Sequence, residues 1–99
     1  MVENSAIAAA KEYAGQVRKI MNPQAIYLYG SHAKGTANHN SDIDIAVIVD
    51  SIQGDYLTAI SNLWKLTRSV NDDIEPVLLT TKDDDNGFLK TIIHTGIAV

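Results

Sequence analysis

The stretch that most constrains the fold is residues 25–50, where two apolar segments flank a small, polar connection. The first segment, AIYLY, stops at Gly30-Ser31. After ten intervening residues the alternation DIDI, which begins at Asp42, opens a second apolar run. Two strands joined by a turn of small and polar residues fit this pattern. We therefore expect the chain to build its sheet around this strand pair.

Two carboxylates stand at the start of the second strand. Alternate side chains of a strand point to opposite faces, so Asp42 and Asp44 are expected side by side. Like charges at the start of an apolar strand repel unless cations or donors neutralise them. Mg²⁺ takes carboxylate oxygens and fills its other positions with water and substrate phosphates, which predicts nucleotide chemistry. The alternative is a pair of solvated aspartates at a strand end.

The spacing of these residues carries a family resemblance. Gly30-Ser31, the ten-residue gap, Asp42-Ile43-Asp44 and a later acidic strand resemble the signature of the DNA polymerase β-like nucleotidyltransferase superfamily, specifically its minimal nucleotidyltransferase branch. The resemblance extends over roughly the whole chain. It implies that Asp42 and Asp44 bridge two Mg²⁺ ions, and that Gly30, Ser31 and the N–H groups after them hold the phosphates of ATP.

A third carboxylate is expected on a neighbouring strand. Glu75 lies between Ile74 and Pro76 in the segment DIEPVLL, and we predict that it binds the catalytic metal and helps to draw the proton from the acceptor hydroxyl. The family's usual residue is an aspartate followed by an apolar run without proline. Asp73, on the same face of this strand, therefore stays open as the alternative.

Other polar residues near the site have ordinary alternatives. Lys34 either adds a point charge to the triphosphate or is a solvated lysine. Ser31 is predicted to begin a helical turn and to cap its N–H groups. His32 and His39 lack the partner spacing of a zinc site and are predicted to be loop histidines. The acidic run 83–85 is predicted to be a solvated approach to the last helix.

The remaining pattern alternates helices with short strands. Long helices are expected over Ser5–Met21, Asp55–Val70 and Gly87–Thr95, and strands over Ala25–Tyr29, Asp42–Val49, Asp73–Leu79 and Ile97–Val99. We therefore predict a single domain, residues 1–99, of the α/β (α+β) class. By resemblance, this is a polymerase β-like fold with helices on a small mixed sheet of three to four strands.

Four details of packing also follow from the sequence. The second long helix is expected to carry Leu57, Ile60, Trp64, Thr67 and the flanking Leu63 and Leu66 on or near its buried stripe, with Trp64 in the core. Pro76 cannot donate to a strand ladder, which predicts that its strand lies at a sheet edge or is irregular there. The last helix is expected to turn Phe88, Leu89, Ile92 and Ile93 inward. Gly96 is expected to end that helix as a C′ glycine.

Composition restricts where and on what the chain acts. Its net charge is −4, and its eight Lys and Arg residues are scattered, so stand-alone nucleic-acid binding is not expected. There is no cysteine, which excludes disulfides and thiolate metal sites. No signal peptide or membrane span is recognisable, and the expected location is the cytoplasm.

These observations predict a Mg²⁺-dependent nucleotidyltransferase that moves AMP from ATP to an acceptor hydroxyl and releases pyrophosphate. Larger members of the superfamily grip the acceptor with an added domain, so here a partner or a second copy of the chain is expected to supply acceptor recognition. The minimal branch is similar to antitoxins that adenylylate a tyrosine of a HEPN-type toxin. Alternatives are a catalytically silent nucleotide- or partner-binding module that neutralises a partner by contact, and antibiotic nucleotidylation.

Overall fold

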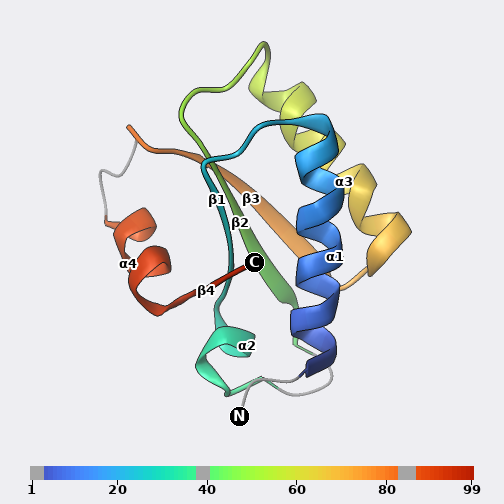
Figure 1. Cartoon of the computed structure of the whole chain (residues 1–99), viewed down its shortest axis with the longest axis vertical. Helices are drawn as coiled ribbons and strands as arrows, with labels where there is room; N and C mark the ends of the chain where they lie inside the picture. The colour runs from blue at the N-terminus through green and yellow to red at the C-terminus, as the bar shows by residue number, and fades with distance from the viewer. Residues whose placement is uncertain (1–3, 38–40, 83–86) are drawn as a thin grey trace.

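The computed structural model describes residues 4–37, 41–82 and 87–99 of the chain. The elements follow in the order α1 (Asn4–Ile20), β1 (Ala25–Tyr29), α2 (Ser31–Lys34), β2 (Ile43–Val49), α3 (Tyr56–Val70), β3 (Ile74–Thr80), α4 (Phe88–Thr95) and β4 (Ile97–Ala98). The predicted elements agree with these to within one residue at each end. Figure 1 shows α1 and α3 on one side of the sheet, α4 on the other and α2 at one end.

The four strands form one mixed sheet in the order β3-β2-β1-β4. β1 and β2 are antiparallel, as are β1 and β4, whereas β2 and β3 are parallel and are joined through α3. A parallel pair needs such a crossover because the chain must return to the same end of the sheet. β3 lies at the edge, which confirms the prediction drawn from Pro76.

The main core lies between the sheet and the two long helices. Strand residues such as Ile26, Leu28 and Ile45 are at most 1% exposed and belong to the same buried cluster as the inner side chains of α1 and α3. The buried Tyr13 hydroxyl of α1 donates to the Leu63 carbonyl of α3 at 2.6 Å. This bond joins the two helices and satisfies a polar group that burial would otherwise leave costly.

The predicted inner face of α3 is confirmed in part. Leu63 and Thr67 are buried as predicted, whereas Trp64 is 45% exposed and Leu57 68% exposed. The inner stripe is centred on Leu63 because α1 and the sheet both contact that side of α3. The helical period allowed a broad stripe, and tertiary packing decided which part of it is buried.

α4 makes a thinner cover for the other face of the sheet. Its Leu89 and Ile92 are buried as predicted, but Phe88 and Ile93 are exposed. A helix of eight residues has room to bury only its central inward positions, and the outer ones stay in solvent. None of the described helices combines the length and apolar character that crossing a bilayer requires.

Gly96 ends α4 for a different reason from the one predicted. Its backbone is extended, with φ −83° and ψ 173°, so it is not a left-handed C′ glycine. A Cβ at this position would lie 2.6 Å from the Ile92 carbonyl oxygen and 3.0 Å from that of Leu28. Glycine is therefore required where α4 turns closely past β1 into β4. The predicted acidic run 83–85 and His39 lie outside the described residues.

Candidate active site

The sheet aligns three polar side chains across neighbouring strands. Tyr29 of β1 is paired with Asp44 of β2, and Asp44 is paired with Glu75 of β3. Directly paired residues of adjacent strands share a face, so the three form a row across the sheet. Alternation along β2 places this row on the face opposite to α1 and α3, since Ile43 and Ile45 point into the main core.

Asp42 joins the row from the residue before β2. It is exposed, and its carboxyl group is close enough to that of Glu75 to raise the pKa of Glu75. The structure thus brings Glu75 to the two aspartates. Asp73, the alternative third carboxylate, is an exposed residue before β3 whose carbonyl accepts a hydrogen bond from the Ile43 amide at 2.8 Å.

The carboxyl groups of the site repel one another when they are ionised. Burial raises the pKa of Asp44, the charge of Asp42 raises it further, and His32 acts in the opposite direction. Partial desolvation and the charges of Asp42 and Asp44 also raise the pKa of Glu75. The site therefore favours protons or other cations among these oxygens.

Tyr29 is a site residue that the sequence did not single out. Burial raises the pKa of its hydroxyl, and the charges of Asp44 and Glu75 act in the same direction. Its ring meets Phe88 of α4 edge to face, with the centroids 5.7 Å apart and an interplanar angle of 83°. α4 thus supports one wall of the site through Tyr29. The signal for this residue lay in the strand register, which the sequence alone did not fix.

Gly30 forms the turn between β1 and the short helix α2. Its φ of 73° and ψ of −150° belong to a region that glycine alone occupies readily. A Cβ on Gly30 would overlap Oδ2 of Asp44, so the backbone of the turn lies directly against that carboxylate. A side chain at position 30 would therefore collide with Asp44, and the phosphate contact expected of Gly30 stays a prediction.

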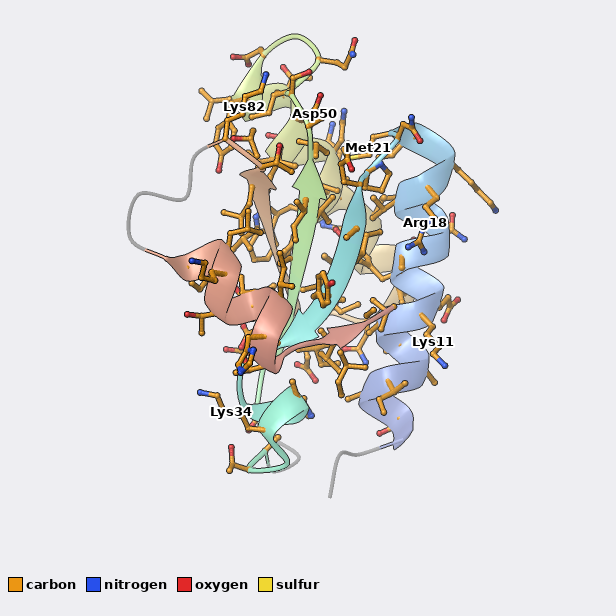
Figure 2. All side chains as sticks on the ribbon, turned by 60° about the vertical axis from the view of Figure 1, so that its left-hand side comes forward. Lys11, Arg18, Met21, Lys34, Asp50 and Lys82 are labelled. Carbon is orange, nitrogen blue, oxygen red and sulfur yellow. The ribbon has the colours of Figure 1, made fainter. Side chains whose placement is uncertain are left out.

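The helical turn after Gly30 differs in detail from the prediction. Gly30 is the N-cap, and Ser31 is the first residue of α2 without a capping hydrogen bond from its side chain. The backbone conformation of Gly30 begins the helix one residue before a Ser31 cap would. Lys34 is exposed. Figure 2 shows it at the α2 end of the sheet, far from Asp50 and Lys82 at the other end.

His32 is neither in a loop nor solvated, contrary to the prediction. It belongs to α2 and is only 4% exposed. Its Nε2 lies 3.3 Å from the Ser41 carbonyl oxygen, and among the described residues its Nδ1 has no hydrogen-bond partner. Sequence reasoning missed this residue because burial of a polar ring depends on how the chain closes over it.

The carboxylates of the site are candidate ligands for a metal ion. Within residues 4–37, 41–82 and 87–99, no group of three His, Cys, Asp or Glu side chains has the spacing of a metal-ligand set. The chemistry of the donors nevertheless suits a hard cation, because Asp42, Asp44 and Glu75 offer carboxylate oxygens whose mutual repulsion a cation would relieve.

A pocket of about 470 Å³ opens at the other end of the sheet, between the end of α1 and the start of α3. Met21, Asp50 and Asn62 contribute to its lining. In Figure 2, Met21 and Asp50 lie at the end of the sheet opposite to Lys34. The pocket is therefore remote from the carboxylates, and the chemistry of the site comes from the open sheet face.

A mixed sheet with two aspartates at the start of its central strand, a third carboxylate beside them and a glycine turn against them defines a nucleotidyltransferase type of site. The family model of polymerase beta nucleotidyltransferases matches residues 11–99. The chain therefore belongs to that family.

Individual relatives were found in both sequence and structure. The chain is 40% identical over 55 residues to protein adenylyltransferase MntA of Shewanella oneidensis strain MR-1. The match covers 54% of this chain and 38% of MntA, so the chain spans well under half of that relative.

Three solved structures share the fold. A toxin–antitoxin with AMP-PNP is 26% identical, with a TM-score of 0.66 over 89% of this chain and 70% of that one. A variant of the toxin–antitoxin MntA–HpeT is 26% identical, with a TM-score of 0.66 over 90% and 69%. A Sulfolobus solfataricus nucleotidyltransferase structure, 21% identical, gives a TM-score of 0.63 over 97% and 86%, which supports the fold alone.

Proposed function

We propose that this chain is a Mg²⁺-dependent protein adenylyltransferase, which moves AMP from ATP to a hydroxyl group of a partner protein in the cytoplasm. The observation that carries the proposal is the row of Asp44 and Glu75 on paired strands, with Asp42 one residue before β2 and the Gly30 turn against Asp44. Family membership makes nucleotidyl transfer the reaction class.

Each side chain has a place in this reaction. Gly30, Ser31 and the first N–H groups of α2 would hold the β- and γ-phosphates, with Lys34 adding positive charge. Asp42, Asp44 and Glu75 would hold two Mg²⁺ ions, which when bound neutralise the phosphates and polarise the reacting oxygens. Catalysis then rests on positioning and charge neutralisation.

The transfer step follows from this placement. The acceptor hydroxyl oxygen forms a bond to the α-phosphorus of ATP, and the bond from that phosphorus to the bridging oxygen of the β-phosphate breaks. Pyrophosphate leaves with the electron pair of the broken bond. Glu75 would accept the hydroxyl proton, and the nearby charges of Asp42 and Asp44, which raise its pKa, favour proton uptake.

The identity of the acceptor rests on the relatives. MntA is named a protein adenylyltransferase, and two structural relatives are toxin–antitoxin complexes. We therefore propose that the acceptor is a tyrosine hydroxyl of a toxin encoded beside this chain, of the helical HEPN type that the sequence resemblance implies. Modification of that residue would be the antitoxin activity.

The direct test incubates the purified chain with Mg²⁺ and α-³²P-labelled ATP, with and without the protein encoded beside it. Label is expected on the neighbouring protein, and mass spectrometry should locate AMP on a tyrosine. The matched control replaces both aspartates, Asp42→Ala and Asp44→Ala, and should transfer no label.

Failure of the test has a specific meaning. If no label transfers while the two proteins still associate, and the double variant neutralises its partner as well as wild type does, the chain is a silent binding module. If label appears instead on an aminoglycoside in a parallel reaction, the activity is antibiotic nucleotidylation. Either result would overturn the proposal.

A further inference from the structure

The imidazole ring of His32 is buried, although its hydrogen bonds do not compensate for the cost of burial. It is 4% exposed, in a helix of four residues that follows the Gly30 turn. Burying an imidazole ring is costly unless both nitrogens find partners. Only Nε2 has a partner among the described residues, the Ser41 carbonyl oxygen at 3.3 Å, and Nδ1 has none. An apolar residue would fill this position at lower cost.

The hydrogen bond of His32 connects the turn after Gly30 to the start of β2. Because a carbonyl oxygen only accepts, Nε2 must carry the hydrogen. His32 lies in the turn that would hold the triphosphate, and Ser41 directly precedes Asp42. The bond spans nine positions in sequence and ties the turn to the start of the carboxylate strand.

A second contact joins the same turn to the carboxylates. Gly30, two residues before His32, has its backbone against the Asp44 carboxylate. The turn therefore meets the carboxylate strand at two points, through the backbone of Gly30 and through the ring of His32.

We propose that His32 is a positioning residue for nucleotidyl transfer, which holds the phosphate-binding turn and Asp42 at one fixed separation through its Nε2 hydrogen bond to Ser41. The inference rests on the proposed function and deepens it. Residues that orient the direct ligands of a metal or substrate typically change affinity or activity by about 10- to 100-fold when they are replaced. His32 should act through Asp42 and need not touch the nucleotide.

Three substitutions separate the possible roles of the ring. His32→Gln places an amide nitrogen near the position of Nε2 and can keep the bond to Ser41. His32→Asn places its amide near Nδ1 and is too short for that bond, while His32→Leu fills the volume without a polar atom. His94→Gln is the matched control, because His94 is exposed in the last turn of α4.

The primary measurement is the Kd of MgATP by isothermal titration calorimetry, with the melting temperature recorded for each variant. Kd should rise by about tenfold or more in His32→Asn and His32→Leu, and stay within about threefold of wild type in the Gln and control variants. His32→Leu should melt close to wild type, since loss of the Nε2 hydrogen bond is offset by removal of the buried Nδ1, which has no partner among the described residues. A structural role alone predicts lower melting with unchanged Kd, which would overturn the proposal, as would unfolding of both variants.

A double-mutant cycle tests whether His32 acts through Asp42. MgATP affinity is measured for His32→Leu, for Asp42→Asn and for the double variant. If His32 positions Asp42, its removal should have little further effect once the carboxylate is gone, so the two changes should be non-additive. Additive changes would contradict the proposal.

Binding and transfer are measured separately so that two failures can be told apart. If wild type binds MgATP but labels no acceptor, the proposed function fails while the binding cycle still decides the role of His32. If transfer is observed, kcat should also fall in His32→Leu and be rescued in His32→Gln. Transfer with wild-type kcat and Kd in His32→Leu would overturn the positioning role alone.

Discussion

The two faces of this sheet divide stability from chemistry. The face under α1 and α3 presents Ile26, Leu28 and Ile45, which are at most 1% exposed. The opposite face presents Asp44 and Glu75 at one end, and α4 contacts this sheet mainly through β1. Neighbouring residues of β2 thus have different roles, because the alternation of side chains directs Ile45 to the core and Asp44 to the site. A small domain can keep mutually repelling groups when one face carries the stability.

The largest expected effect concerns the sheet face that carries Asp44 and Glu75, here called the chemical face. Asp44→Asn keeps the shape of the side chain but removes its charge, and should lower kcat by about a hundred- to a thousandfold, a loss typical for removal of a central charge-stabilising group. Its melting temperature in metal-free buffer should equal or exceed that of wild type, because repulsion from Asp42 is lost. Labelling kinetics and thermal unfolding measure the two effects. A large loss of stability would show that the faces are not separate.

The covered face should respond in the opposite way. Leu63→Ala removes a fully buried side chain of α3 and should lower the free energy of unfolding by about 3 kcal/mol, with kcat per folded molecule unchanged. Leu57→Ala is the matched control on the same helix, since Leu57 is 68% exposed, and should cost less than about 0.5 kcal/mol. Urea unfolding measures both. Equal costs would contradict the observed inner stripe.

This pair of leucines also shows what the sequence could and could not predict. The helix and a broad stripe that includes Leu63 and Thr67 were predictable from its period, but only the packing of α1 against α3 centred the buried side on Leu63. Trp64 was wrongly placed in the core for this reason. The position of β3 at the edge was predictable because Pro76 lacks a donor, which is a local property.

The candidate site shows the same division. Asp42 and Asp44 were predictable because strand alternation is local, and Glu75 because it interrupts an apolar strand. Tyr29 and His32 were not, since their surroundings come from strand pairing and from closure of the turn over Ser41. Local pattern identifies the charged groups, and tertiary contacts determine what surrounds them.

Substitution of two glycines tests whether the contact between the Gly30 turn and Asp44 is needed. Gly30→Ala places a Cβ against the Asp44 carboxylate in a backbone region that suits glycine alone, and should lower the free energy of unfolding by about 2 kcal/mol and abolish labelling. Gly54→Ala has a similar φ of 75° with nothing within 4 Å, and should cost about 1 kcal/mol with activity retained. If both variants stay active, the contact between the turn and Asp44 is not needed.

The smallest expected effect is a pH dependence that belongs to the chemical face alone. Asp44 and Glu75 have pKa values raised above those of the unfolded chain, so over that interval the folded protein binds more protons than the unfolded one. Their contribution to stability is therefore complete below the unfolded pKa and is lost as pH rises through the raised values. Asp42→Asn removes the charge common to both shifts and should flatten this decline.

Thermal unfolding in EDTA from pH 4 to 7, recorded as the difference between wild type and Asp42→Asn, isolates these groups from the other carboxylates of the chain. The melting temperature of wild type should fall relative to the variant as pH rises, because Asp42 repels ionised Asp44 and Glu75. Mg²⁺ should reverse the fall in wild type more than in the variant, since a bound cation stabilises the folded state. A difference that rises with pH would mean that the three carboxylates do not repel one another in solution. The claim that one face of the sheet supplies stability while the other carries mutually repelling carboxylates would then be wrong.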